Sequence, residues 1–69
     1  MSDTETVMWN GRQFELTVRK VNEEPERWVA WIKVVGKDDL GGRNSSSFTG
    51  LMEGEVREKA KEWMIRWRN

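Results

Sequence analysis

Residues 7–18, VMWNGRQFELTV, hold the pair Asn10-Gly11 between two runs in which apolar residues recur at every second position. An Asn-Gly pair is the strongest short hairpin signal, because a type I′ turn needs positive φ at both central positions. The pattern predicts antiparallel strands over residues 5–9 and 12–21. The turn also fixes which residues lie opposite each other: Trp9 with Arg12, Val7 with Phe14, and Glu5 with Leu16.

Alternation assigns the two faces of this hairpin, since successive side chains of a strand point to opposite sides. The predicted core face carries Val7, Trp9, Phe14, Leu16 and Val18. The predicted solvent face carries Thr6, Met8, Gln13, Glu15, Thr17 and Arg19. A third strand is expected over residues 28–36, where both faces are apolar and only Lys33 is charged. If Lys33 points outward, the core receives Trp28, Ala30, Ile32 and Val34, and the outer face receives Val29, Trp31, Lys33 and Val35. A slip of one residue would invert this assignment.

The remaining segments complete an α+β fold. Residues 1–4 are expected to be a disordered tail, residues 22–27 a charged connection that holds the single Pro, and residues 37–46 a turn-rich loop. Residues 47–49 can add a short fourth strand. After Glu53 the apolar spacing changes to three or four, which predicts an amphipathic helix over residues 55–68. Its buried stripe is expected to contain Val56, Ala60, Trp63 and Trp67, with Met64 at the edge, Ile65 on the opposite side, and Gly54 or Glu53 as the cap. The predicted architecture is a three- or four-stranded antiparallel meander with this C-terminal helix packed on one face.

Composition narrows the chemistry of this single domain. The chain has 69 residues, no Cys and no His, and its 12 basic and 12 acidic residues cancel. It therefore lacks the commonest metal ligand and the commonest general base near neutral pH. We expect no enzyme activity, no metal site and no cofactor. No apolar run approaches the roughly 20 residues that span a bilayer, so no membrane partner is expected. The absence of Cys agrees with a cytoplasmic protein.

Three motifs are better explained as solvated loops than as reactive sites. Glu23, Glu24 and Glu26 surround the Pro, and Asp38-Asp39 precede a glycine pair, but neither group has the spacing of a metal-binding loop. Residues 41–47, GGRNSSS, could hold an anion on backbone amides, with Arg43 as the residue to test, yet they lack the Gly-Lys-Ser/Thr ending of a P-loop. The serines of this run have no evident base to activate them.

Tryptophan beside basic residues is the best functional indication. A small domain has a limited core, so association is a reasonable expectation. We expect a non-enzymatic interaction module that forms a homodimer or binds an unidentified protein partner through the outer sheet face. The predicted interface residues are Met8, Arg19, Val29, Trp31 and Val35. The alternative is weak nucleic-acid binding, with Trp31 stacking on a base and the basic side chains near phosphate: Arg19, Lys33 and Arg43.

Overall fold

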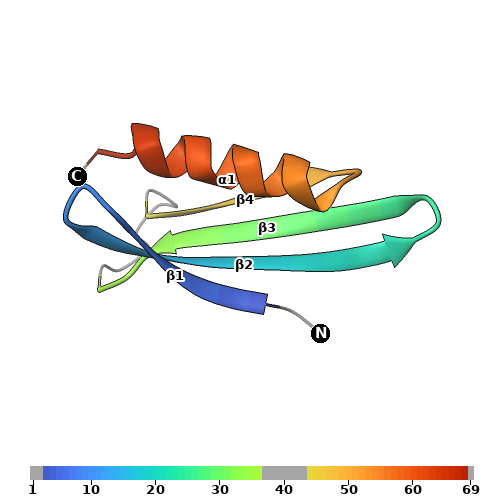
Figure 1. The fold of residues 1–69 in the computed structure, drawn as a ribbon, viewed down its shortest axis with the longest axis horizontal. Coiled ribbons are helices and arrows are strands. Elements are labelled where there is room, and N and C mark those ends of the chain that lie inside the picture. The colour runs from blue at the N-terminus through green and yellow to red at the C-terminus, as the bar shows by residue number, and fades with distance from the viewer. Residues whose placement is uncertain (1–2, 37–43, 69) are drawn as a thin grey trace.

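The computed structural model describes residues 3–36 and 44–68. It contains one antiparallel sheet with the strand order β1-β2-β3-β4, followed by one helix (Figure 1). The elements are β1 (Asp3–Trp9), β2 (Arg12–Glu23), β3 (Glu26–Val34), β4 (Ser45–Gly50) and α1 (Glu53–Arg66). The predicted α+β meander with a C-terminal helix is therefore confirmed, in its four-stranded form.

The Asn10-Gly11 turn has the backbone that its sequence requires. Asn10 has φ 53° and Gly11 has φ 76°, so both central residues of the turn lie in the left-handed region. The predicted register of the first hairpin is confirmed, from Trp9 opposite Arg12 to Glu5 opposite Leu16. The first strand starts earlier than predicted, because Thr4 pairs with Thr17 and the two hydroxyls lie 2.9 Å apart. Of the expected tail, residues 1–2 lie outside the described residues.

The predicted orientation of β3 is also confirmed. Ala30, Ile32 and Val34 are buried, whereas Trp31 and Lys33 are exposed. The strand ends at Val34, so Val35 and Gly36 lie in the turn that follows it and not in the strand predicted over 28–36. Among the described residues, nine buried side chains form the core: Phe14, Leu16, Val18, Ala30, Ile32, Val34, Val56, Ala60 and Met64.

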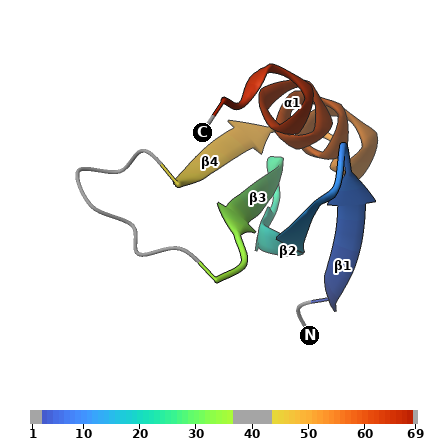
Figure 2. The same ribbon diagram turned by 90° about the vertical axis from the view of Figure 1, so that its left-hand side faces the viewer.

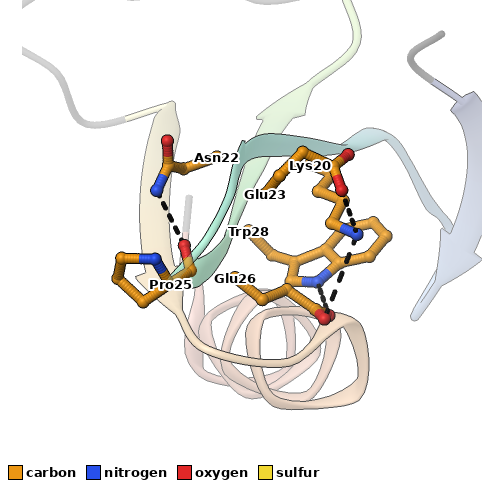
Figure 3. Close-up of polar contacts among 6 residues, drawn as sticks. All are labelled: Lys20, Asn22, Glu23, Pro25, Glu26 and Trp28. Atoms are coloured by element: carbon orange, nitrogen blue, oxygen red, sulfur yellow. Dashed lines mark hydrogen bonds and ion pairs between the residues drawn. The ribbon is translucent and has the colours of Figure 1, made fainter.

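The prediction of a charged connection over residues 22–27 is wrong. β2 and β3 continue into it and pair up to Glu23 and Glu26, which leaves only Glu24 and Pro25 in the turn. Polar contacts stabilise this extension of the hairpin (Figure 3). Asn22 Nδ2 donates a hydrogen bond to the Pro25 carbonyl at 2.7 Å. Lys20 Nζ lies 3.3 Å from Glu23 and 4.0 Å from Glu26, and it sits 5.9 Å from the Trp28 ring centroid. Two of the carboxylates that suggested a loop, those of Glu23 and Glu26, therefore pair with Lys20 of β2.

Helix α1 is rotated relative to the prediction. Val56, Ala60 and Met64 are its buried residues, while Trp63 is only half-buried. Ala30 and Ala60 are both fully buried, and such small side chains let the helix approach the sheet closely. The bulky indole of Trp63 packs against this core while partly exposed, edge-on to Phe14, and the unbranched Met64 is buried instead.

Both ends of the helix also differ from the prediction. The cap residue is Met52, whose side chain makes no capping hydrogen bond. Glu55 instead accepts the Leu51 backbone N–H at 3.0 Å, which satisfies a donor just before the first turn. The helix ends at Arg66, and Trp67 adopts an extended backbone. Trp67 then packs edge-on against Phe14, with ring centroids 5.9 Å apart.

Candidate interaction surface on the outer sheet face

Trp31 lies in the middle of the sheet, on the face opposite α1. Its cross-strand neighbours are Thr17 on β2 and Ser47 on β4, and Thr4 continues the same row on β1. The helix covers only the other face of the sheet (Figure 2). Trp31 is 42% exposed although its strand has neighbours on both sides. A large aromatic ring thus stands among short hydroxyl side chains that cannot cover it.

On one side of Trp31, the next row of cross-strand neighbours contains charged residues. Glu15 and Lys33 lie opposite each other, with Lys33 Nζ 3.5 Å from the Glu15 carboxylate. Ser45 is the next residue in that row. Together with Trp31, Thr17 and Ser47 these residues border a shallow hollow of about 360 Å³. The hollow therefore has one aromatic side, one ionic side and hydroxyl groups between them.

The row on the other side of Trp31 contains Arg19 and Val29, which pair with each other, and Thr49 beside Val29. Arg19 is exposed and Val29 is half-buried. Arg19, Val29 and Trp31 thus form a contiguous group, which we call the Trp31 patch.

Two of the predicted interface residues lie apart from the Trp31 patch. Met8 is opposite Gln13, and the Val35 N–H donates to the Gln13 carbonyl at 2.9 Å. Met8 and Val35 therefore lie in the same row of cross-strand neighbours, at the far end of the sheet. The row of Glu15 and Lys33 separates them from Trp31. Met8 is 63% exposed and Val35 is half-buried. The sheet register brings three of the five residues together and leaves the other two as a second, smaller group.

The structure describes three of the four residues predicted for nucleic-acid binding. Arg19, Trp31 and Lys33 share the outer face, but the Lys33 ammonium already pairs with Glu15. Arg43 lies outside the described residues, as do Asp38, Asp39 and the glycine pair. The described part of the site therefore presents one cation without an ion pair, Arg19, next to one carboxylate and one paired ammonium.

The acidic residues around Pro25 have structural contacts. Glu26 accepts the Trp28 Nε1–H at 2.5 Å, and Glu23 pairs with Lys20. Within residues 3–36 and 44–68, no group of three or more acidic residues is arranged to hold a metal ion. These contacts explain why the side chains gather at this end of the hairpin (Figure 3).

Sequence reasoning placed Ile65 on the exposed side of the helix but missed the larger apolar region that it shares with Trp9, at the first edge of the sheet. Trp9 was expected in the core, but it is 43% exposed because α1 packs mainly over β2, β3 and β4. Ile65 on α1 is 47% exposed, and both residues line the same open hollow with Asn10 and Arg68. The position of Trp9 next to the turn, on the first strand of a meander, was the available signal, since it places the ring at a corner of the sheet.

Two wider findings complete the description. Among the described residues, the one helix is too short and too polar to cross a bilayer. No protein-family model, curated protein or solved structure matches this chain.

Proposed function

We propose that this chain is a small non-enzymatic interaction module that binds a protein chain, either a second copy or another protein, through its outer sheet face. The observation that carries the proposal is the exposure of Trp31 in the centre of a sheet whose other face is filled by the helix. Exposed Trp is costly to leave in water and is among the residue types that dominate binding energy at protein interfaces.

The Trp31 patch has the composition of a binding anchor. Arg19 contributes a guanidinium that can pair with a carboxylate or stack on a ring, and Val29 contributes apolar area beside the indole. The surrounding Thr and Ser hydroxyls form a polar rim, as expected around the centre of a transient interface. Met8 and Val35 would lie at the margin of such a contact, because they occupy the far row of the sheet.

Nucleic-acid binding through Arg19, Trp31, Lys33 and Arg43 is the second candidate. Its support is the exposed indole beside basic residues, which can stack a base near phosphate. The Glu15 carboxylate within 3.5 Å of Lys33 opposes an incoming phosphate, and the chain has no net charge to attract one. We therefore rank a protein partner first.

We further propose a cytoplasmic location. The support is compositional: the chain has no Cys, and disulfides are common in small domains of oxidising compartments. The same absence of Cys and His supports a role that needs no cofactor.

Trp31→Glu tests the proposed surface, with Met52→Glu as the matched control. Both variants place a carboxylate where an exposed apolar side chain stands, 42% exposed on β3 and 65% exposed just before α1. Proteins from a lysate are captured on the immobilised chain, with and without nuclease, and the solution mass is measured by light scattering. We expect Trp31→Glu to stay folded and to lose the captured partner, and Met52→Glu to retain it.

Two results would contradict this proposal. If Trp31→Glu and the parent chain capture the same proteins at the same level, the outer face is not the interface. If nuclease removes the captured material and binding weakens steeply as salt rises, the nucleic-acid candidate replaces it.

A further inference from the structure

Strand β1 is an open edge of the sheet. It is seven residues long and pairs with β2 on one side (Figure 2). In a two-residue hairpin, Trp9 and Arg12 form a hydrogen-bonded pair, and alternation then directs the backbone groups of Val7 and Glu5 toward β2. The N–H and C=O groups of Thr4, Thr6 and Met8 point to the opposite side. The described residues place no strand there.

β1 has few of the features that normally prevent edge pairing. Native edge strands are blunted by charged side chains, Lys above all, by Pro, by bulges, or by a covering element. The sequence DTETVMW contains neither Lys nor Pro, and its register with β2 is continuous. Its carboxylates are Asp3 and Glu5, and that of Glu5 is paired with Arg57 of α1. Backbone groups on its free side are therefore available to another strand.

The other edge of the sheet differs from β1. The Asn44 carbonyl accepts the Val34 N–H at 2.8 Å, so by alternation the Thr49 carbonyl points away from β3. Lys59 of α1 reaches over and donates its Nζ–H to that carbonyl at 3.1 Å. Edge β4 thus has a helix side chain on its free backbone, as protected edges do.

Apolar side chains flank the free edge of β1 on both faces of the sheet. Met8 is 63% exposed on the outer face, and Trp9 is 43% exposed on the helix side. Ile65 on the flank of α1 faces the same hollow as Trp9. An added strand would cover apolar surface on both faces while it satisfies the backbone.

The sequence of β1 is complementary to itself when two copies run antiparallel about Thr6. The hydrogen-bonded positions then join Thr6 to Thr6 of the second copy and Thr4 to its Met8. Glu5 lies opposite Val7 of the second copy, and Asp3 opposite its Trp9, so no like charges face each other. Trp9 also comes diagonally next to Glu5 of the second copy, whose carboxylate pairs with Arg57.

We infer that two copies of this chain associate through antiparallel pairing of their β1 strands, centred on Thr6, into one continuous sheet with both helices on the same face. The contact is small for a protein interface, so the dimer is weak, with a dissociation constant of roughly 10 μM to 1 mM. The surface differs from the Trp31 patch, and substitutions at the two places test different claims.

Charge at Thr6 provides the sharpest test, because this residue faces its own copy across the twofold axis. Thr6 is exposed, and its neighbour Glu15 within the chain already pairs with Lys33. Sedimentation equilibrium is run from about 10 μM to about 1 mM, the range in which a weak dimer changes its population. The samples are the parent chain, Thr6→Lys, Thr6→Glu, and an equimolar mixture of these two variants. Leu51→Lys is the matched control, since it introduces the same charge at an exposed position outside both proposed surfaces, between β4 and α1.

We expect the parent chain and Leu51→Lys to reach the dimer mass as concentration rises. Thr6→Lys and Thr6→Glu alone should each associate at least about tenfold more weakly, because equal charges meet at the centre. Mixing them should restore association, because opposite charges then face each other. Far-UV circular dichroism confirms that each variant keeps its fold.

Three outcomes would overturn the inference. One is a parent chain that stays monomeric at the highest concentration, which would leave the edge to a strand of a different protein. Another is a Thr6→Lys variant that dimerises like the parent. The third is a dimer that Trp31→Glu abolishes and Thr6→Lys leaves intact, which would assign self-association to the outer sheet face instead.

Discussion

Phe14 is the residue on which the two C-terminal indoles converge. Its ring lies edge-on to Trp63, with centroids 6.3 Å apart, and edge-on to Trp67. The Arg12 guanidinium stacks on the outer side of Trp67, 5.5 Å from the ring centroid. A single side chain on β2 therefore anchors both the last turn of α1 and the residue that follows it.

Phe14→Leu should test this anchor without leaving a large cavity. Leucine keeps most of the apolar volume but loses both aromatic edge contacts, each worth about 0.5–1.5 kcal/mol. We expect the free energy of unfolding to fall by about 1–3 kcal/mol, measured from urea unfolding curves. Trp31→Leu is the control and should change it by less than about 0.5 kcal/mol, because Trp31 lies on the solvent face. Equal losses in the two variants would show that the indoles do not rest on Phe14.

Individual residues also show which predictions the sequence could support. Lys33 gave the correct orientation of β3, because burying one lysine would cost more than exposing Trp31. Nothing in the spacing of α1 distinguished Met64 from Trp63 as the buried residue, since both lie close to the same stripe. Which of these two residues is buried depends on how closely the helix packs on the sheet at Ala30. The sequence alone does not give that distance.

At the scale of elements, the junction between β4 and α1 is closely packed at Gly50. A Cβ on Gly50 would lie 2.2 Å from Glu55 Oε1 and 3.1 Å from Val56 Cγ1. The same Glu55 oxygen accepts the Leu51 N–H, so the absence of a side chain at Gly50 makes room for this capping contact.

Gly50→Ala should therefore weaken the start of the helix. The added methyl displaces the Glu55 carboxylate and frees the Leu51 N–H, which should cost about 1–2 kcal/mol in the free energy of unfolding. Gly54→Ala is the control, because a Cβ at that position meets no atom within 4 Å. Alanine also favours a helix over glycine, so Gly54→Ala should raise stability by about 0.5–1 kcal/mol. Thermal unfolding followed by circular dichroism measures the stability of both variants. A Gly50→Ala variant more stable than the parent chain would show that Gly50 is not closely packed against Glu55.

The β2–β3 hairpin shows where sequence reasoning about an element fails. A run of five polar residues and a Pro normally predicts a loop, and the alternation does stop at Val21. Across the strands, Lys20 pairs with Glu26 beside Trp28, and Lys20 also pairs with Glu23 on its own strand. A cross-strand ion pair of this kind is recognised only when the register is known.

At the scale of the whole molecule, one layer of side chains joins the sheet to the helix. The buried residues of β2, β3 and α1 form a single cluster, against which the partly buried Val7, Trp28, Phe48, Trp63 and Trp67 pack. The radius of gyration is 12.1 Å, slightly above the roughly 11 Å typical of a compact chain of this length, because the β2–β3 hairpin projects beyond the helix (Figure 1).

A single core predicts a single unfolding transition. We expect the midpoints in urea to coincide when unfolding is followed by far-UV circular dichroism and by tryptophan fluorescence. Circular dichroism reports on α1 and the sheet together, whereas fluorescence reports on indoles in the strands and near the end of the helix. Midpoints that differ beyond experimental error would show that the projecting hairpin or the helix unfolds independently.

Lys59 has a consequence for how far assembly can proceed. Sheets that expose two free edges can add copies at both sides without limit, which is how fibrils grow. Here the Lys59 ammonium group on α1 occupies the Thr49 carbonyl at the second edge. If two copies pair through β1, each uses its unprotected edge, and a further copy could add only at the edge where this lysine takes one of the backbone acceptors. On the inferred pairing, Lys59 would therefore favour a dimer over a growing fibril.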